Sequence, residues 1–405
     1  MPPYMPREIT DTIISAVPLE HYYDYRPSRT HTLAMCALVC RAWLPRSRVE
    51  LFKDILILDE HTYDLLVERV LHSETMSRYL ASVNSLGLGC LGKPDPRSKA
   101  ARLFFVEFAG KLPGLRTLDV HHIDFTHQRP SVRWPLLLSQ FRTITSLRLW
   151  SCRFSSFSDV RRLLTALPLL STLAISQLTW PVVSHELHLQ TTLRPRTFWP
   201  ELHTLGIHDL STECAAVFLR WIVGALHGSP VKVLDCDFSN LPSTGPLQEA
   251  VDAFMGRVGP SVTDLDMNIN DTLPLSGFIA LEHLSCDLIV YKGKWEGVAS
   301  VLQGVSSNTI QSIIFNYVYT HRWYSRHNIN TTYLRFDNDT LEELDRVLSG
   351  EPFGGLRDVI LRVVAEKEEE EELIRAHARR CLPELHKRRI LHLYVNGRLQ
   401  RLDVE

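Results

Sequence analysis

The chain has 405 residues, of which 45% are hydrophobic and 22% charged, and this composition is typical of a folded protein with a large core. Its 44 lysines and arginines nearly cancel its 46 aspartates and glutamates, giving a net charge of −2 that excludes a strongly basic nucleic-acid binder. No apolar run reaches the ~18 residues that a membrane helix needs. We therefore expect a soluble chain in the cytoplasm, the nucleus or both, with no nucleic-acid or membrane partner.

Two helices are predicted near the N-terminus. After Met5 and Pro6, the residues Ile9, Ile13 and Val17 recur at the spacing of one helical face. Residues 33–43 form a second, densely apolar helical segment that ends at Trp43, and Leu51 and Phe52 close the unit. A unit of about fifty residues is marginal alone, so a partner or a neighbouring domain is expected to cover its apolar surface.

The first helical segment starts with Pro-Xaa-Glu-Ile-Xaa-Asp-Xaa-Ile-Ile at Pro6, and the second contains Leu-Val-Cys-Arg-Ala-Trp from Leu38. By these two motifs the segments resemble the F-box family. The resemblance implies a small all-α domain over residues 1–53 that docks on a Skp-type adaptor, which joins it to a cullin–RING ubiquitin ligase. It further implies that the adaptor surface is formed or supported by Pro6, Ile9, Ile13, Leu38, Val39 and Trp43.

The segment departs from the family pattern at two places. Met5 stands where the family usually has leucine, which conserves volume and apolarity. Residues 21–29 lengthen the connection between the two helices, which costs little stability but could obstruct docking. An alternative is that Ile9, Ile13, Leu38 and Trp43 pack against the first repeat as an N-terminal cap.

A strand motif recurs along residues 54–405. Each copy has an apolar residue, two variable positions, a second apolar residue, one variable position and a third apolar residue, and most copies lie 26 to 32 residues apart. The middle apolar residues are Ile55, Leu86, Leu118, Leu147, Leu173, Leu205, Leu234, Leu265, Leu284, Ile313, Val359 and Leu393. A weaker strand is expected over residues 334–336.

Helical patterns lie between these strands. One follows Ser158-Asp159, a second follows Thr212-Glu213, and a third spans residues 250–258. A fourth begins with a capping box at Thr340 and ends near Gly350. The acidic run 366–372 precedes basic residues at 375–380, as the dipole of a further helix favours. Because a strand and a helix cannot bury their own apolar faces, the repeats are expected to stack into a solenoid.

The predicted fold is therefore α/β: a small all-α F-box over residues 1–53, followed over residues 54–405 by an irregular leucine-rich-repeat-like solenoid. In this solenoid a curved parallel sheet carries outer helices. The motif and its period resemble those of leucine-rich repeats, in longer and less regular form.

Motifs of catalysis and cofactor binding are missing from the sequence. It contains no Gly-rich phosphate loop, no His-Glu-Xaa-Xaa-His and no Gly-Xaa-Ser-Xaa-Gly. Cys36 and Cys40 share a helical face, but without a second pair at ligand spacing core packing explains them better than a metal. We expect no enzymatic activity, no metal and no cofactor.

Substrate contacts are predicted on the exposed face of the sheet, where the residues flanking the core apolar pair point. Five carboxylates fall there on three neighbouring strands: Asp235, Asp237, Asp264, Asp266 and Asp287. We hypothesise that they receive a basic segment of a protein substrate, with Arg148 and Trp150 as a separate anchor. The alternative is a face kept hydrated by its charge.

The predicted function is that of a substrate-recognition subunit of a cullin–RING ubiquitin ligase. Its F-box would dock on a Skp-type adaptor and its solenoid would bind a target protein whose identity the sequence does not give. The alternative is a scaffold or protein-binding module that works without a ligase.

Overall fold

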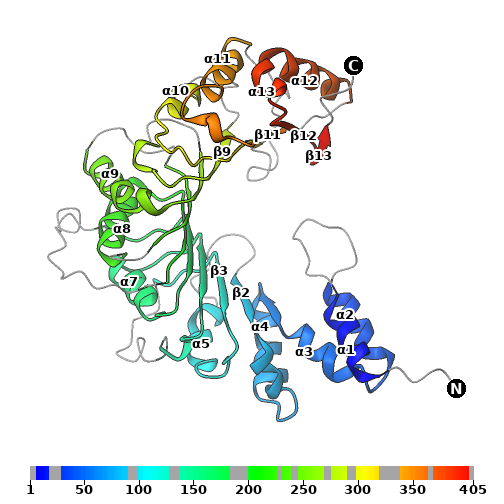
Figure 1. Cartoon of the computed structure of the whole chain (residues 1–405). Helices are drawn as coiled ribbons and strands as arrows, with labels where there is room; N and C mark the ends of the chain where they lie inside the picture. Colours follow the sequence, from blue (N-terminus) through cyan, green and yellow to red (C-terminus); the bar gives the residue numbers. More distant parts are fainter. Residues whose placement is uncertain are drawn as a thin grey trace. The chain divides into compact units, whose positions relative to one another are not determined.

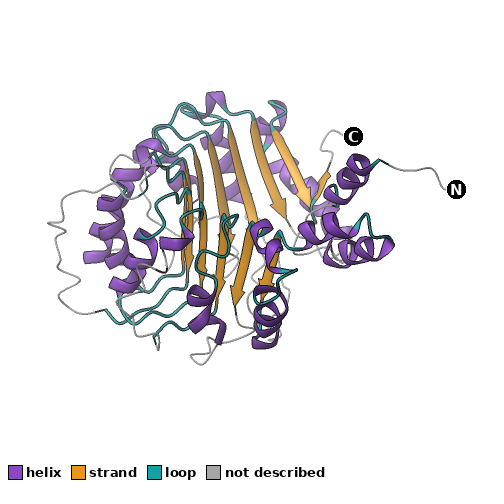
Figure 2. Cartoon of the chain, turned by 90° about the horizontal axis from the view of Figure 1, so that it is seen from below, coloured by secondary structure: helices purple, strands orange, loops and turns teal. Residues whose placement is uncertain are grey.

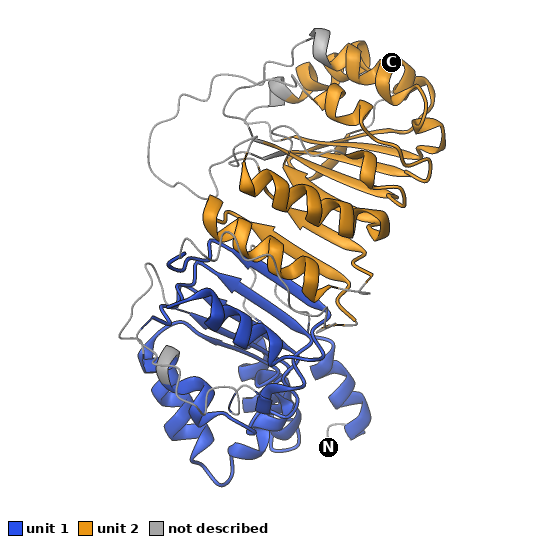
Figure 3. Cartoon of the chain, turned by 90° about the vertical axis from the view of Figure 1, so that its left-hand side faces the viewer, with its two compact units in different colours: residues 1–182 blue, residues 183–405 orange. Residues whose placement is uncertain are grey.

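The computed structural model divides into two compact units, residues 1–182 and 183–405, shown in Figure 3. It describes residues 6–17, 29–89, 99–126, 137, 139–182, 199, 201–226, 230–238, 245–268, 275–289, 298–318, 338–363 and 368–400. In this described part no helix has the length and apolarity needed to cross a membrane. The predicted domain boundary at residue 53 stays a prediction.

Three helices open unit 1: α1 (Arg7–Ser15), α2 (Arg29–Val39) and α3 (Leu44–Leu51). α3 contacts both of the others (Figure 1). Ile14 of α1 and Leu33 of α2 are buried between the elements, whereas Ile9 and Ile13 are exposed. The predicted apolar stripe of α1 is therefore its outward face. The lengthened connection lies outside the described residues.

The rest of unit 1 alternates strands with helices (Figure 1). Its strands, each paired in parallel with the next, are β1 (Asp54–Ile57), β2 (Ser85–Gly89), β3 (Thr117–His121), β4 (Ser146–Trp150) and β5 (Thr172–Ser176). Its helical elements are α4 (Glu60–Leu66), η1 (Val67–Leu71), η2 (Ser77–Ser82), α5 (Lys99–Glu107), η3 (Ser139–Phe141) and α7 (Phe157–Thr165). Stacked rings of Phe104, Phe108 and Phe141 lie in its core.

Unit 2 continues the pattern, with its strands side by side (Figure 2). They are β6 (Thr204–His208), β7 (Val233–Cys236), β8 (Asp264–Asn268), β9 (His283–Ile289), β10 (Ser312–Val318), β11 (Asp358–Val363), β12 (Leu391–Val395) and β13 (Arg398–Gln400). The helical elements are α8 (Thr212–Ala225), α9 (Pro246–Val258), η4 (Gly259–Ser261), η5 (Leu275–Gly277), α10 (Val298–Gln303), α11 (Asn338–Leu348), η7 (Phe353–Gly355), α12 (Glu368–Cys381) and α13 (Pro383–Lys387). β6 to β12 pair in parallel, and only β13 among the described strands of this unit runs antiparallel to its neighbour.

The middle apolar residue of every predicted strand copy lies inside a strand, β1 to β12 in order, so the repeat prediction is confirmed. The weaker strand over residues 334–336 lies outside the described residues. β13 was not predicted; it folds back through a turn at Asn396 and Gly397, both with positive φ. Two predicted helix starts were wrong: α7 begins at Phe157, before Ser158, and α11 begins at Asn338, before Thr340.

A left-handed residue follows several strands directly. His122, Ser151 and Gln177 have φ values of 54°, 50° and 53° after β3, β4 and β5, and Asp209 has 48° after β6. The amide of His122 donates to the carbonyl of Trp150 (2.8 Å), and that of Ser151 donates to Ser176 (2.9 Å). These hydrogen bonds fix a turn directly after the strand, where the chain leaves the sheet. After β4, Ser151 is followed by Cys152, whose buried thiol lies 3.5 Å from the Val120 carbonyl.

Alternation along the strands sets which side chains can serve a site. In β8, Leu265 and Met267 are buried while Asp264, Asp266 and Asn268 are part-exposed on the other face. The parallel register then places equivalent positions of neighbouring strands side by side. In each unit, every second side chain of each strand therefore lies on the same exposed face of the sheet.

Candidate functional site

Two surfaces of the described chain carry most of the predicted site residues, and Arg148 and Trp150 lie apart from them on β4. One is the exposed apolar surface of α1 and α2, which we define as Ile9, Ile13, Met35, Leu38 and Val39. The other is the sheet face of β7, β8 and β9 in unit 2, which we call the acidic face and define as Asp235, Asp237, Asp264, Asp266 and Asp287.

The apolar surface of α1 and α2 is open to solvent. Relative exposure is 51% for Ile9 and 46% for Ile13, and it reaches 52% for Met35, 79% for Leu38 and 61% for Val39. Ile9 and Ile13 are one turn apart on α1, and the other three share a stripe of α2. Ile9, Ile13 and Leu38 therefore do not pack as a cap on the first repeat.

Pro6 and Trp43 support these helices from their ends. Pro6 precedes α1, and its carbonyl accepts the amides of Ile9 and Thr10, both at 3.2 Å. Trp43 is half-buried at the start of α3, and its amide donates to the Cys40 carbonyl at 3.2 Å. Both residues lie at helix ends, and their part in the adaptor surface stays a prediction.

The acidic face gathers the five predicted carboxylates on adjacent parallel strands. Asp235 is in register with Asp266, and Asp287 is in register with Asn268, so acidic side chains of β7, β8 and β9 point from the same side of the sheet. Asp237 follows β7 directly, and its amide donates to Ile207 at 3.0 Å. The strand register places Asp235, Asp266 and Asp287 on one side of the sheet, and the role of the five carboxylates in substrate binding stays a prediction.

Burial, together with repulsion between carboxylates, raises the pKa of two residues of the acidic face, Asp266 and Asp287. Burial, followed by the charges of Asp287 and Asp235, raises the pKa of Asp266 to about 6. Burial also raises the pKa of Asp287, and the charges of Asp235 and Asp237 add to it. Asp266 therefore stays partly protonated just below neutral pH, and a bound cation would favour the release of that proton.

Sequence reasoning missed the polar residues around the acidic face. His208 of β6 lies with Nε2 3.1 Å from Asp235 Oδ2; burial lowers its pKa, but the hydrogen bond and the charges of Asp235 and Asp237 raise it overall. Asn316 of β10 donates to Asp287 Oδ1 (2.9 Å) and to Ser285 Oγ (3.0 Å). These residues occupy strand-face positions of the neighbouring repeats, so the repeat motif itself was the signal that could have found them.

Arg148 and Trp150, the predicted anchor, lie on β4 in unit 1. Arg148 is exposed, with Nη1 3.7 Å from Asp119 Oδ2, and Trp150 is half-buried, with its ring centroid 6.4 Å from that of His121. Burial raises the pKa of Asp119 and lowers that of His121. The pair forms a local polar and aromatic patch on the sheet face of unit 1.

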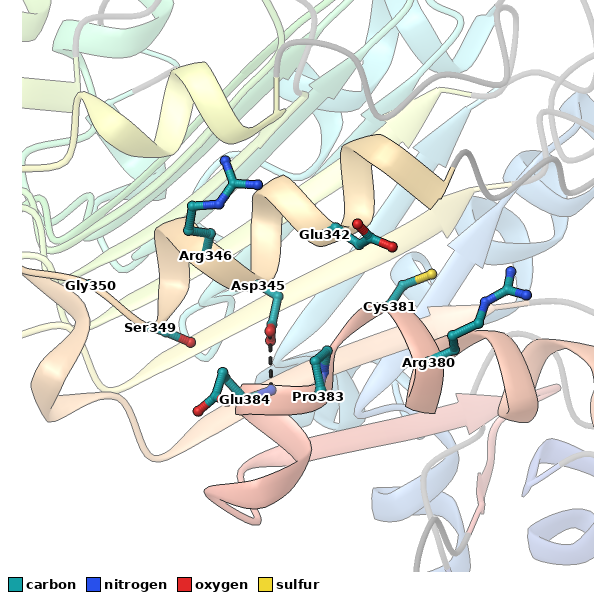
Figure 4. Close-up of a pocket in the computed structure, with 9 residues that line it drawn as sticks. All are labelled: Glu342, Asp345, Arg346, Ser349, Gly350, Arg380, Cys381, Pro383 and Glu384. Atoms are coloured by element: carbon teal, nitrogen blue, oxygen red, sulfur yellow. Dashed lines mark hydrogen bonds between the residues drawn. The ribbon is translucent and has the colours of Figure 1, made fainter.

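A cavity of about 520 Å³ lies in unit 2 between α11, the end of α12 and the start of α13 (Figure 4). Asp345 on its wall accepts the amides of Glu384 and Leu385, each at 3.1 Å, and so caps α13. Cys381 Sγ lies 3.6 Å from His377 Nε2. Burial raises the pKa of that thiol and lowers the pKa of that imidazole, so the pair is neutral and unsuited to nucleophilic chemistry.

Among the described residues, no three histidine, cysteine, aspartate or glutamate side chains are grouped so that they could hold a metal ion. No protein-family model and no curated protein matches the chain. Among solved structures it is similar to a chain of the crystal structure of the Rad7 and Elc1 complex in yeast, at 14% identity and a TM-score of 0.38, over 87% of this chain and 74% of that chain. A similarity at this level carries no conclusion about function.

Proposed function

We propose that the chain is the substrate-recognition subunit of a cullin–RING ubiquitin ligase. α1 and α2 dock on a Skp-type adaptor, and the repeats hold a protein substrate. The chemistry of ubiquitin transfer belongs to the other subunits, and this chain supplies proximity. The observation that supports the proposal best is the exposure of Ile9, Ile13, Leu38 and Val39, which the F-box resemblance assigns to the adaptor surface.

The physical argument is the cost of leaving this surface in water. A fully buried leucine, isoleucine or valine side chain contributes roughly 1.5–3 kcal/mol relative to an exposed one. Five such side chains on two short helices form a surface whose burial by a partner offsets much of the cost of association. A partner with an apolar groove fits it, as the resemblance implies for the adaptor.

The proposal is tested by mixing the full chain with a purified Skp-type adaptor. We expect a stable complex on size-exclusion chromatography. The exposed thiol of Cys40, which follows α2 directly, serves as a reporter because maleimide labelling at this site should slow at least tenfold when the adaptor covers α2. A folded chain that elutes alone, with an unchanged labelling rate at Cys40, contradicts the ligase proposal and favours a scaffold that binds other partners.

We further propose that the acidic face receives a basic, extended segment of the substrate. Few cationic side chains lie on the described strands next to its five carboxylates. One of them, Arg362 on β11, donates to Asn316 Oδ1 at 3.4 Å. A half-buried row of like charges on a sheet face attracts lysine and arginine side chains and steers their approach. Arg148 and Trp150 on the face of unit 1 remain proposed as a separate anchor.

Changing Asp264 and Asp266 together to lysine should weaken binding of a fluorescent decalysine peptide at least tenfold at low salt, because the local charge changes by four. Asp252 lies exposed on helix α9 rather than on the sheet face, so Asp252→Lys is the control for added positive charge. Fluorescence anisotropy against salt concentration measures both. Equal affinity of the double variant and the wild type would show that this face is merely hydrated.

A further inference from the structure

Helix α3 carries a buried carboxylate that three cations surround. The side chain of Glu50 is 1% exposed. Its Oε2 lies 3.1 Å from Arg29 Nη2, and its Oε1 lies 2.7 Å from both Arg46 Nη2 and Lys53 Nζ. A charge in this position is stable only while its partners stay in place.

This network joins four elements. Arg29 begins α2 and also holds Asp54 of β1, with Nη1 2.8 Å from Oδ2. Arg46 belongs to α3, and its Nε and Nη2 donate to Ser15 Oγ at the end of α1, at 3.0 and 2.6 Å. One buried anion thus links α1, α2 and α3 to the first strand of the repeats.

The C-terminal end of α3 is fastened to the first repeat by different contacts. Phe52 stacks on Tyr79 of η2, with centroids 5.7 Å apart and planes 14° from parallel. The Arg48 guanidinium lies 6.0 Å from the same ring. The carbonyl of Lys53 accepts the amides of Asn84 and Ser85 at the start of β2, at 2.8 and 2.9 Å.

We propose that α3 is a rigid coupling, with Glu50 as its positioning residue, that fixes α1 and α2 to the first repeats of unit 1. The consequence for function rests on the proposed adaptor docking: a partner bound to α1 and α2 is held at one position relative to the sheet face of unit 1. If Glu50 is neutralised, Asp54 alone faces the cations Arg29, Arg46 and Lys53, and their mutual repulsion loosens the joint.

The test is a distance distribution measured by pulsed electron paramagnetic resonance on the full chain. One spin label is on Cys40 and the other on Val106→Cys, an exposed position of α5, with Cys36 and Cys90 changed to serine. We expect a single narrow distribution for this parent and one at least twice as broad after Glu50→Gln. Arg7→Gln, which removes only the exposed Arg7–Asp11 pair of α1, is the matched control and should leave the width unchanged.

A second variant distinguishes a loosened joint from unfolding of the helices, which Glu50→Gln could also cause. Phe52→Ala weakens the α3–η2 contact and leaves the Glu50 network intact, so the distribution should broaden while the helical circular dichroism is retained. A broad distribution in the parent, or a width that neither variant changes, overturns the proposal. No adaptor is present in this measurement, so its failure and a failure of adaptor docking are separate results.

Discussion

A chain carrying Ile9→Asp and Leu38→Lys should lose at least 100-fold in affinity for the Skp-type adaptor while its thermal stability stays the same. Both substitutions place a charge in an apolar interface, where desolvation without a partner costs several kcal/mol. In the free chain the same positions are 51% and 79% exposed, so little packing is lost. Aspartate in the first turn of α1 and lysine in the last turn of α2 also complement the helix dipoles.

Isothermal titration calorimetry and a thermal melt separate these two effects. Leu373→Lys on α12 is the matched control, because Leu373 is another highly exposed leucine on a helix but lies in unit 2. It should change neither adaptor affinity nor stability. An adaptor affinity that is equal in the double variant and the wild type would show that α1 and α2 are not the docking surface.

The strands could be predicted from the sequence because each carries two or three apolar residues at alternate positions and the pattern returns about once per repeat. Periodicity of this kind reports burial directly: Leu118, Leu147 and Leu173 are all buried in their strands. The same alternation predicted which carboxylates share a face, since a residue between two buried ones must point the other way. The acidic face follows from these two facts.

Other features depend on tertiary contacts that no local pattern contains. Glu50 looks like a surface residue of an amphipathic helix, and only the fold brings Arg29 to it from twenty-one positions away. The choice of Ile14 over Ile13 as the buried residue of α1 depends on where α3 packs. The His208 imidazole reaches Asp235 only because β6 and β7 pair in parallel, a contact between residues twenty-seven positions apart.

Replacing Asp266 with asparagine should stabilise the chain by about 1 to 2 kcal/mol at pH 7.5 and have little effect near pH 4. The pKa of Asp266 is about 6 in the folded chain and 3.8 for an unperturbed aspartate, so the folded state binds the proton more tightly. Between these values the wild type loses stability as the pH rises, and above pH 6 it carries the full cost of an ionised carboxylate that is partly buried and faces Asp287 and Asp235. Because the side chain is part-exposed, solvent screening reduces that cost below the roughly 3 kcal/mol that two pKa units imply.

Asparagine keeps the shape of Asp266 and removes only its titration, so the difference between the variant and the wild type should grow from pH 4 to pH 7 and then level off. Urea unfolding at several pH values measures it, and Asp252→Asn on α9 is the control for loss of an exposed carboxylate. A difference that does not vary with pH would mean that Asp266 ionises normally. In that case the carboxylates of the acidic face do not interact strongly, and a basic ligand would bind there without releasing protons.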